Sequence, residues 1–319
     1  MTTRTSTNAD TRLATVDAGD WRLPAAGGDL DELAHAAGLA ARTVPLDVDD
    51  ALLRFASASN HAGALLIRNV PIGDVPSTPP APDAPSDKGL ATEFALLTVA
   101  RRLGQPVGYV PEHGGRIVQN LVPVSSDADL QTSTSSRSDL MFHTETAFHP
   151  HRPRHLLLLC LRGDPSAHTT LASVRDVIER LDERELALAF EPRFRTAVDA
   201  SFLAGRTTEL SAPRPLITGT LHEPTFVFDA DLTIGIDTDA EDLLDRIRNL
   251  IHDVETSVVL RAGDLLVVDN NVAVHGRSPF SARFDGTDRW LQRAFVVTDL
   301  APSAAERTGR VITTEFGHR

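Results

Sequence analysis

The sequence is poor in cysteine and in long apolar runs, and both shortages limit what the protein can be. Its one cysteine, Cys160, has no partner for an intrachain disulfide, which fits a reducing cytoplasm. No run reaches the roughly 18 apolar residues that indicate a membrane span. The polar start, MTTRTSTNADTR, has no apolar segment behind it, so no secretory signal is indicated. We therefore expect a cytoplasmic chain.

Positive charge is scarce beside negative charge. The 319 residues include 31 Lys and Arg against 44 Asp and Glu, which gives a formal net charge of −13. So acidic a surface repels both nucleic acid and anionic lipid, and neither is an expected partner. With 41% hydrophobic residues, the chain has enough apolar side chains for a large core.

The pattern of apolar residues predicts a mainly β protein with flanking helices. The N-terminal third reads as helices at residues 30–41, about 47–62 and 90–104, with one strand at 63–73. From residue 107 onward short β-rich segments dominate, interrupted by helices that start at Ser173 and at about residue 240. Many strands at short spacing with few helices favour a sandwich or a barrel.

These patterns also suggest how the chain is divided. We expect a frayed start at residues 1–20 and one domain over 21–319. Its helical part covers about residues 21–105 and its β core about 106–300. Residues 74–87, DVPSTPPAPDAPSD, are too rich in proline for a helix or a strand and are expected to form a mobile loop.

A possible metal site lies in the segment MFHTETAFHP, residues 141–150. If FHTE is an extended strand, His143 and Glu145 point the same way, about 6 to 7 Å apart, and can bind one cation. His275, at the end of a strongly apolar strand pair and followed by Gly276, is the best candidate for a third ligand. Two histidines and one carboxylate on one face of an octahedron are typical of non-heme Fe(II) oxygenases.

The histidines also allow less specific interpretations, which stay open at this point. An H-x-E pair occurs by chance in a chain with twelve histidines. A zinc cluster could draw on neighbouring histidines, but PHRPRH reads as a solvated, arginine-rich turn; these histidines are His149, His151, His155 and His168. Without cysteine partners or an H-E-x-x-H motif, a zinc hydrolase is the weaker enzyme hypothesis.

Two arginines strengthen the case for an enzyme. In DGTDRWLQRAFVV, Arg289 and Arg293 share a strand face with Leu291 between them. Inward guanidinium groups are costly to bury unless anions meet them. They lie about 13 Å apart along a strand, too far to hold one small carboxylate together, so two separate carboxylates are expected. The alternative is a pair of surface arginines on an edge strand.

Together these features resemble a known family. FHTETAFHPHRP, LLLLCLRGD, TTLAS, GDLLVVDNNVAVHGR and FDGTDRWLQRAFV follow the order found in Fe(II)/2-oxoglutarate-dependent dioxygenases. The similarity is to the clavaminate synthase-like branch, with its asparagine and arginine β-hydroxylases of peptide-antibiotic pathways. It spans residues about 107 to 298, and H-x-E in place of H-x-D is a mark of this branch. The implied fold is a double-stranded β-helix, or jelly roll.

The resemblance also implies roles for individual residues. His143, Glu145 and His275 match the iron ligands. Arg289 matches the arginine that binds the C5 carboxylate of 2-oxoglutarate, and Thr170 in TTLAS matches the threonine that assists it. Arg293 matches the arginine that holds the α-carboxylate of the substrate. The implied cofactor is Fe(II), and the implied cosubstrates are 2-oxoglutarate and O2.

The resemblance places the substrate end as well. Glu112 resembles the residue that takes the substrate α-amine, Ser133 a polar side chain that touches the substrate, and Asp229 an aspartate facing the distal side chain. Arginine hydroxylases carry a second acid where this chain has Val227, which leaves lysine, ornithine, asparagine or a related amino acid open. Asp229 could instead be a turn-forming residue at the end of its strand.

The expected activity is hydroxylation, at C3 or C4, of a free L-amino acid with a cationic or amide side chain, in natural-product biosynthesis. One alternative is oxidation of a carrier-bound or peptide-linked residue, against which Glu112 and Arg293 argue. Desaturation or cyclisation is another. A non-catalytic metal-binding jelly roll is the third, although such a protein has no use for Arg289 and Thr170 beside the metal.

Overall fold

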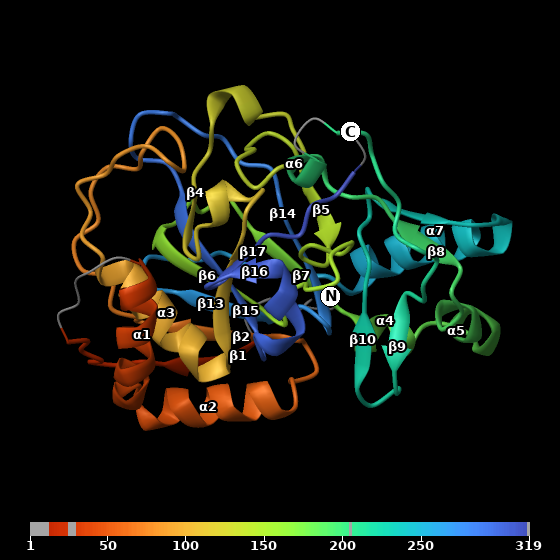
Figure 1. The fold of residues 1–319 in the computed structure, drawn as a ribbon, viewed down its shortest axis with the longest axis horizontal. Coiled ribbons are helices and arrows are strands. Elements are labelled where there is room, and N and C mark those ends of the chain that lie inside the picture. Colours follow the sequence, from red (N-terminus) through yellow and green to blue (C-terminus); the bar gives the residue numbers. More distant parts are fainter. Residues whose placement is uncertain (1–12, 25–29, 204–205, 318–319) are drawn as a thin grey trace, which may run out of the picture.

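The computed structural model describes residues 13–24, 30–203 and 206–317, and they form a mostly β structure with helices on two sides (Figure 1). This confirms the expected mainly β class with flanking helices. Within the described ranges, no helix is long and apolar enough to cross a membrane.

The larger of the two main sheets has nine strands. Its order is β1 (Ala14–Asp17), β2 (Ala64–Arg68), β13 (Leu265–Asp269), β6 (His155–Arg162), β15 (Trp290–Val297), β3 (Gln105–Tyr109), β17 (Val311–Ile312) and β16 (Arg307–Thr308), with β4 (Gln119–Leu121) also paired to β15. The central strands β13, β6 and β15 are the apolar runs LLVVD, HLLLLCLR and WLQRAFVV, buried almost throughout. Strands covered on both faces need such continuous runs.

Three N-terminal helices cover the outer face of this sheet (Figure 1). They are α1 (Leu30–Ala40), α2 (Leu46–Ser57) and α3 (Ala91–Leu103). Because strand side chains alternate between faces, Leu157 and Leu159 of β6 pack against these helices, whereas Leu156 and Leu158 point into the interior.

A four-stranded sheet lies on the interior side of the larger one. Its order is β12 (Thr256–Val258), β7 (Thr169–Ser173), β14 (Ala273–Arg277) and β5 (Leu140–His143). Leu171 and Ala273 share a core with the inward side chains of the larger sheet. Ala172 and Val274 point the other way and pack with α7 (Thr238–Val254). The space between the two sheets is therefore lined by every second residue of β7 and β14.

The remaining elements connect these layers. The helices are α4 (Val174–Ile178), α5 (Glu183–Ala189) and α6 (Ala200–Leu203), with short 3-10 helices η2 (Ala41–Thr43), η3 (His113–Gly115), η4 (Ser125–Asp127) and η5 (Ala301–Glu306). β9 (Ile217–Gly219) and β10 (Pro224–Phe226) form a hairpin, and β8 (Phe194–Thr196) pairs antiparallel with the distant β11 (Thr233–Gly235). The Ser173 side chain accepts the Arg175 N–H at the start of α4, which agrees with the predicted start of a helix at Ser173.

Two expectations need correction. Residues 1–12 of the predicted frayed start lie outside the described residues, but Ala14–Asp17 form β1 and pair in parallel with β2, so residues 14–17 are not frayed. Residues 74–87 contain no helix or strand, as predicted, yet they are held in place. Thr78 donates from its N–H to Gly286 O and from its hydroxyl to Asp288 O, and Asn120 Nδ2 donates to Pro82 O at 3.1 Å.

Candidate active site

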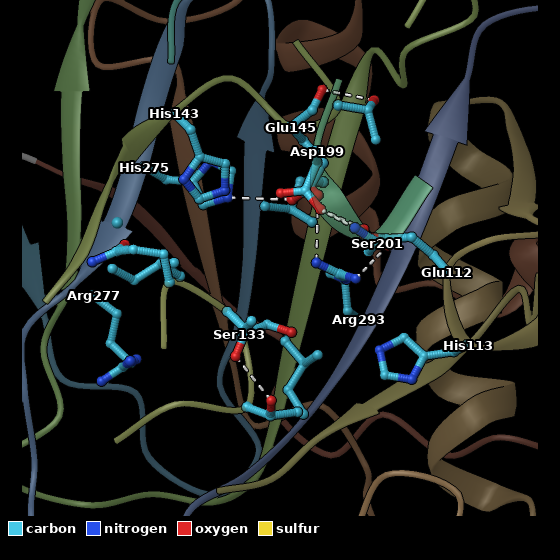
Figure 2. Close-up of a pocket in the computed structure, with 18 of the residues that line it drawn as sticks. Glu112, His113, Ser133, His143, Glu145, Asp199, Ser201, His275, Arg277 and Arg293 are labelled. Atoms are coloured by element: carbon cyan, nitrogen blue, oxygen red, sulfur yellow. Dashed lines mark hydrogen bonds and ion pairs between the residues drawn. The ribbon is translucent and has the colours of Figure 1, made fainter. Parts of the chain in front are cut away.

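One cavity of about 560 Å³ lies between the two sheets and collects most of the residues singled out in the sequence. Its walls come from β5 and β14 of the smaller sheet and from β6 and β15 of the larger one. Leu156, Leu158 and Leu291 make part of its lining apolar. Figure 2 shows the polar side chains that point into it.

The three predicted metal ligands meet in this cavity. His143, Glu145 and His275 each offer one ligand atom, and these atoms lie within 4.8 Å of one another. Among the described residues, this is the one group of three or more such side chains that converges in this way. The His143 and His275 rings have centroids 4.3 Å apart, and His275 Nε2 lies 3.4 Å from Glu145 Oε2.

The two histidines face each other because β5 and β14 are paired. His275 is the direct register partner of His143, and the register shifts between His275 and Arg277. His143 Nδ1 lies 2.8 Å from Met141 O, a hydrogen bond that leaves Nε2 for a ligand. Gly276 is required at this irregularity, since a Cβ there would stand 2.5 Å from Leu140 O.

Glu145 reaches the site in a different way from the one predicted. β5 ends at His143, and Glu145 stands in the turn that follows, not on an extended strand. Asn270 fixes this turn: its Oδ1 accepts the Glu145 N–H at 2.7 Å, and its Nδ2 donates to Glu145 O at 3.1 Å. The turn brings the carboxylate closer to both histidines than the 6 to 7 Å expected from a strand.

The donor set fits a divalent cation such as iron. Glu145 Oε2 and His275 Nδ1 are buried without a hydrogen-bond partner. Burial, together with the neighbouring His143, lowers the pKa of His275 to about 4, so its imidazole is neutral and able to ligate at pH 7. Burial acts to raise the pKa of Glu145, but Arg293 and the contact with His275 outweigh it and hold that pKa below its ordinary value.

Arg289 stands just before β15 with no anion against it. Its side chain is buried, 7% exposed, and lines the cavity. No hydrogen bond or ion pair joins this guanidinium to any residue in the part of the chain that the structure describes. Burial lowers its pKa from the ordinary value. A buried cation without a protein partner is typical of a site for an anionic ligand.

Arg293 differs from Arg289 in having partners already. Its Nη2 lies 2.6 Å from Glu112 Oε2, its Nη1 lies 3.4 Å from Glu145 Oε1, and Nε and Nη2 both donate to Gln119 Oε1. Burial raises the pKa of Glu112, against the opposing effect of Arg293. Figure 2 shows Glu112 and Arg293 side by side beneath Glu145. Adjacent opposite charges of this kind complement a zwitterion.

Thr170 is the predicted residue that the structure does not bring to the cavity. β7 alternates, and Thr170 faces the α7 side together with Ala172, with its hydroxyl near Gly276. Thr169, one residue earlier, lines the cavity instead. Its Oγ1 is buried and has no hydrogen-bond partner.

Ser133 and Asp229 do line the cavity. Asp229 is not on a strand, because β10 ends at Phe226, and it forms an isolated bridge with His143. Its Oδ1 accepts the N–H groups of Asp231 and Leu232, both at 2.9 Å, so the turn-forming interpretation is correct. Burial raises its pKa. Asp229 is thus both a turn residue and part of the cavity wall.

The sequence reasoning missed four further acids of the cavity wall, of which Asp83 and Asp127 have partners of their own in Arg116 and Thr134. The other two are Asp199, before α6, and Asp231. They come together because β8 pairs with β11, in register Thr196 with Thr233, so the residues that follow β8 lie beside those that precede β11. Val227, by contrast, is buried and is not part of the wall. The pairing of two short, distant strands carries no signal in the sequence.

Comparisons with known proteins identify the group to which this arrangement belongs. The family profile for taurine catabolism dioxygenase TauD, TfdA family, matches residues 32–295. The L-lysine 3-hydroxylase of Catenulispora acidiphila is 39% identical over 290 residues, 88% of this chain and 80% of the relative. Clavaminate synthase 2 of Streptomyces clavuligerus is 35% identical, covering 90% of this chain and 89% of the relative.

A solved structure agrees with both relatives. Asparagine oxygenase in complex with Fe(II), 2S,3S-3-hydroxyasparagine and succinate superposes with a TM-score of 0.84 at 34% identity, covering 94% of this chain and 98% of that chain. The resemblance drawn from the sequence motifs is confirmed. This chain belongs to the TauD, TfdA family of dioxygenases, among the Fe(II)/2-oxoglutarate amino acid oxygenases.

Proposed function

We propose that this protein uses Fe(II), 2-oxoglutarate and O2 to hydroxylate, at C3 or C4, a free L-amino acid with a cationic side chain. One observation carries the proposal. The cavity holds the metal triad, an unpaired buried arginine, Arg289, and the ion pair of Glu112 with Arg293. Relatives named L-lysine 3-hydroxylase and L-asparagine oxygenase support the reaction class.

The order of the strands supports the finer fold assignment. From β4 to β15 the chain crosses repeatedly from one sheet to the other. The larger sheet contains β4, β6, β13 and β15, and the smaller one contains β5, β7, β12 and β14. We infer that these eight strands are the two faces of a jelly roll.

The triad is proposed to hold the iron, His143 and His275 through imidazole nitrogens and Glu145 through a carboxylate oxygen. Bound iron supplies oxidative chemistry in which 2-oxoglutarate is decarboxylated to succinate and one oxygen atom enters a C–H bond. The chain supplies geometry: three ligands on one side leave positions for the cosubstrate and O2 on the other. Leu158 and Leu291 keep that side of the cavity apolar.

Arg289 and Thr169 form the proposed cosubstrate subsite. The Arg289 guanidinium is free to pair with a carboxylate, and the Thr169 hydroxyl is buried without a partner. Thr169 therefore replaces Thr170 as the residue assigned to 2-oxoglutarate. Charge-assisted hydrogen bonds from these two groups would hold the C5 carboxylate.

We predict that Thr169→Val raises the KM for 2-oxoglutarate by roughly 10-fold, the loss of one hydrogen bond to a charged group. Thr170→Val, made on the other face of the same strand, is the matched control and is expected to leave that KM unchanged. Steady-state measurement of succinate formation compares the two. If Thr170→Val raised the KM for 2-oxoglutarate and Thr169→Val did not, the assignment would return to Thr170.

Glu112 and Arg293 form the proposed subsite for the amino acid head. The substrate ammonium would approach Glu112, and its carboxylate would approach Arg293. A carrier-bound substrate has its carboxylate in a thioester, which cannot pair with Arg293. Ser133 lies on the wall nearby and offers a hydroxyl to the substrate.

Three further acids on the cavity wall favour a cationic side chain over an amide. They are Asp199, Asp229 and Asp231, and within the described residues no arginine or lysine forms an ion pair with any of them. The Asp231 charge adds to burial in raising the pKa of Asp229. An ammonium or guanidinium group from the substrate would relieve this repulsion. An amino acid held at both ends presents its middle carbons to the metal.

The substrate test is a screen of the twenty amino acids and ornithine with Fe(II), 2-oxoglutarate and O2. Succinate formation is measured with and without each amino acid, and products are examined for the mass of one added oxygen atom. We expect lysine, ornithine or arginine to stimulate succinate formation more than asparagine or glutamine. Stimulation by no free amino acid would contradict the proposed function.

We predict that Asp229→Asn raises the KM for the cationic substrate and also raises the ratio of succinate to hydroxylated product. The asparagine keeps an oxygen for the N–H groups of Asp231 and Leu232, so the turn is preserved while the charge is lost. A substrate amino acid held only by its amino and carboxylate groups moves its side chain away from the metal, and 2-oxoglutarate is then consumed without hydroxylation. An unchanged KM and an unchanged ratio would leave Asp229 a turn residue alone.

A further inference from the structure

Arg277 is a buried cation of the cavity that the proposed function leaves without a role. It stands on β14 two residues after His275, so its side chain shares the inward face with that ligand. It is 3% exposed and lines the cavity. Figure 2 shows it on the His275 side, away from Arg293 and Glu112.

The Arg277 guanidinium holds a neighbouring segment through its backbone and hydroxyl groups. Nη2 donates to Ser135 Oγ at 2.7 Å and to Ser138 O at 3.3 Å. Nη1 donates to Ser278 O at 2.8 Å and to Ser136 O at 3.4 Å. Three of the four acceptors belong to residues 135–138, and the Phe280 ring packs 5.0 Å from the guanidinium carbon.

The segment that Arg277 holds is part of the substrate cavity. Residues 131–138, which we call the Ser133 wall, contain no helix or strand. Four of its residues line the cavity: Gln131, Thr132, Ser133 and Thr134. Part of this wall is held by backbone hydrogen bonds, such as those from the N–H groups of Ser136, Arg137 and Ser138 to Ala128 O. Arg277 adds a side-chain tie from the wall to β14.

The charge of Arg277 is only partly offset by the protein, because Asp139 acts to raise its pKa against the effects of burial and Arg289. Its four acceptors are neutral, and no carboxylate in the described ranges forms an ion pair with it. Arg289, a second buried cation without an ion pair among the described residues, lines the same cavity as Arg277. Thr169 of the cosubstrate subsite is the register partner of Arg277 across β7 and β14. Two like charges therefore line the cavity in which an anion is expected to bind.

We propose that Arg277 is a positioning residue that couples 2-oxoglutarate binding to amino acid binding by fixing the Ser133 wall. A dianion bound beside Arg289 offsets the repulsion between the two guanidinium groups. Arg277 then keeps its hydrogen bonds to Ser135 and Ser138, and the wall is held against the amino acid. The inference rests on the proposed cosubstrate subsite, and linkage requires the coupling to be equal in both directions.

The coupling is measured as binding, without turnover. The Fe(II) protein is titrated anaerobically with lysine by calorimetry, with and without saturating 2-oxoglutarate. For the unaltered protein we expect 2-oxoglutarate to tighten lysine binding by roughly 10-fold, within the usual range of coupling between sites. Arg277→Gln keeps an amide donor but loses the charge, and the factor is expected to fall close to 1. An unchanged factor in Arg277→Gln would overturn the proposal.

Amide hydrogen exchange over residues 131–138 is the second readout, and it needs only Fe(II) and 2-oxoglutarate. Addition of 2-oxoglutarate is expected to slow exchange in the unaltered protein and not in Arg277→Gln. Arg175→Gln is the matched control, because Arg175 also donates to backbone carbonyls, those of Ser59 and Asn60, but lies outside the cavity wall. If Arg277 had a purely structural role, residues 131–138 of Arg277→Gln would exchange faster, but 2-oxoglutarate would still slow that exchange.

Ser135→Ala keeps the proposal testable if Arg277→Gln does not fold. It removes one acceptor of Arg277 and leaves every charge in place. The coupling factor is expected to fall by about half or more, and an unchanged factor would contradict the role of the wall. Failure of the substrate assignment is distinguishable, since lysine would then not bind at all while the exchange response to 2-oxoglutarate remained.

Discussion

Glu145→Ala is expected to abolish succinate formation and iron binding while leaving the protein folded. His143→Ala and His275→Ala are expected to behave in the same way. Loss of an outer hydrogen-bond partner of a metal ligand costs about 10- to 100-fold, so loss of a ligand itself is expected to cost more. The fold survives because the turn that carries Glu145 is held through its backbone by Asn270, which the substitution does not touch.

Iron content and thermal unfolding are measured beside activity to separate the two effects. His168→Ala is the control, a histidine of the same chain that lies outside the cavity wall. It is expected to keep full activity and full iron content. Normal turnover by Glu145→Ala at ordinary iron concentration would refute the assignment of the triad.

The parts of this fold that follow from the sequence are those in which a local pattern decides the structure. β6, β13 and β15 are continuous apolar runs because both of their faces are covered, and α7 has its apolar residues on one side with Asp237 as its N-cap. None of these features requires knowledge of distant contacts.

The residues that the sequence reasoning misplaced depend on contacts far apart in the chain. Glu145 lies near the histidines because Asn270, 125 positions away, fixes its turn. The choice of Thr169 over Thr170 depends on which face of β7 looks inward, and a shift of one residue exchanges the faces. Asp199 and Asp231 meet through β8 and β11, which have three residues each. Short polar strands carry too little periodicity to predict such pairs.

Arg289→Ala is expected to raise the KM for 2-oxoglutarate on the order of 100-fold and to change the KM for the amino acid little. Losing one partner of a buried charged pair costs about 2 to 5 kcal/mol, which corresponds to an effect of this size. The protein itself loses no hydrogen bond, because no described residue accepts one from Arg289. Folding is therefore expected to be preserved, and the effect to lie in cosubstrate binding.

Arg293 calls for a different substitution, because its removal would leave Gln119, Glu112 and Glu145 without their common partner. Arg293→Lys keeps the positive charge among these groups but loses the planar fork that pairs with a carboxylate. We expect it to raise the KM for the amino acid far more than that for 2-oxoglutarate, the opposite pattern to Arg289→Ala. Steady-state rates with each substrate varied in turn give both constants. If both variants weakened only cosubstrate binding, the two arginines would not hold separate carboxylates.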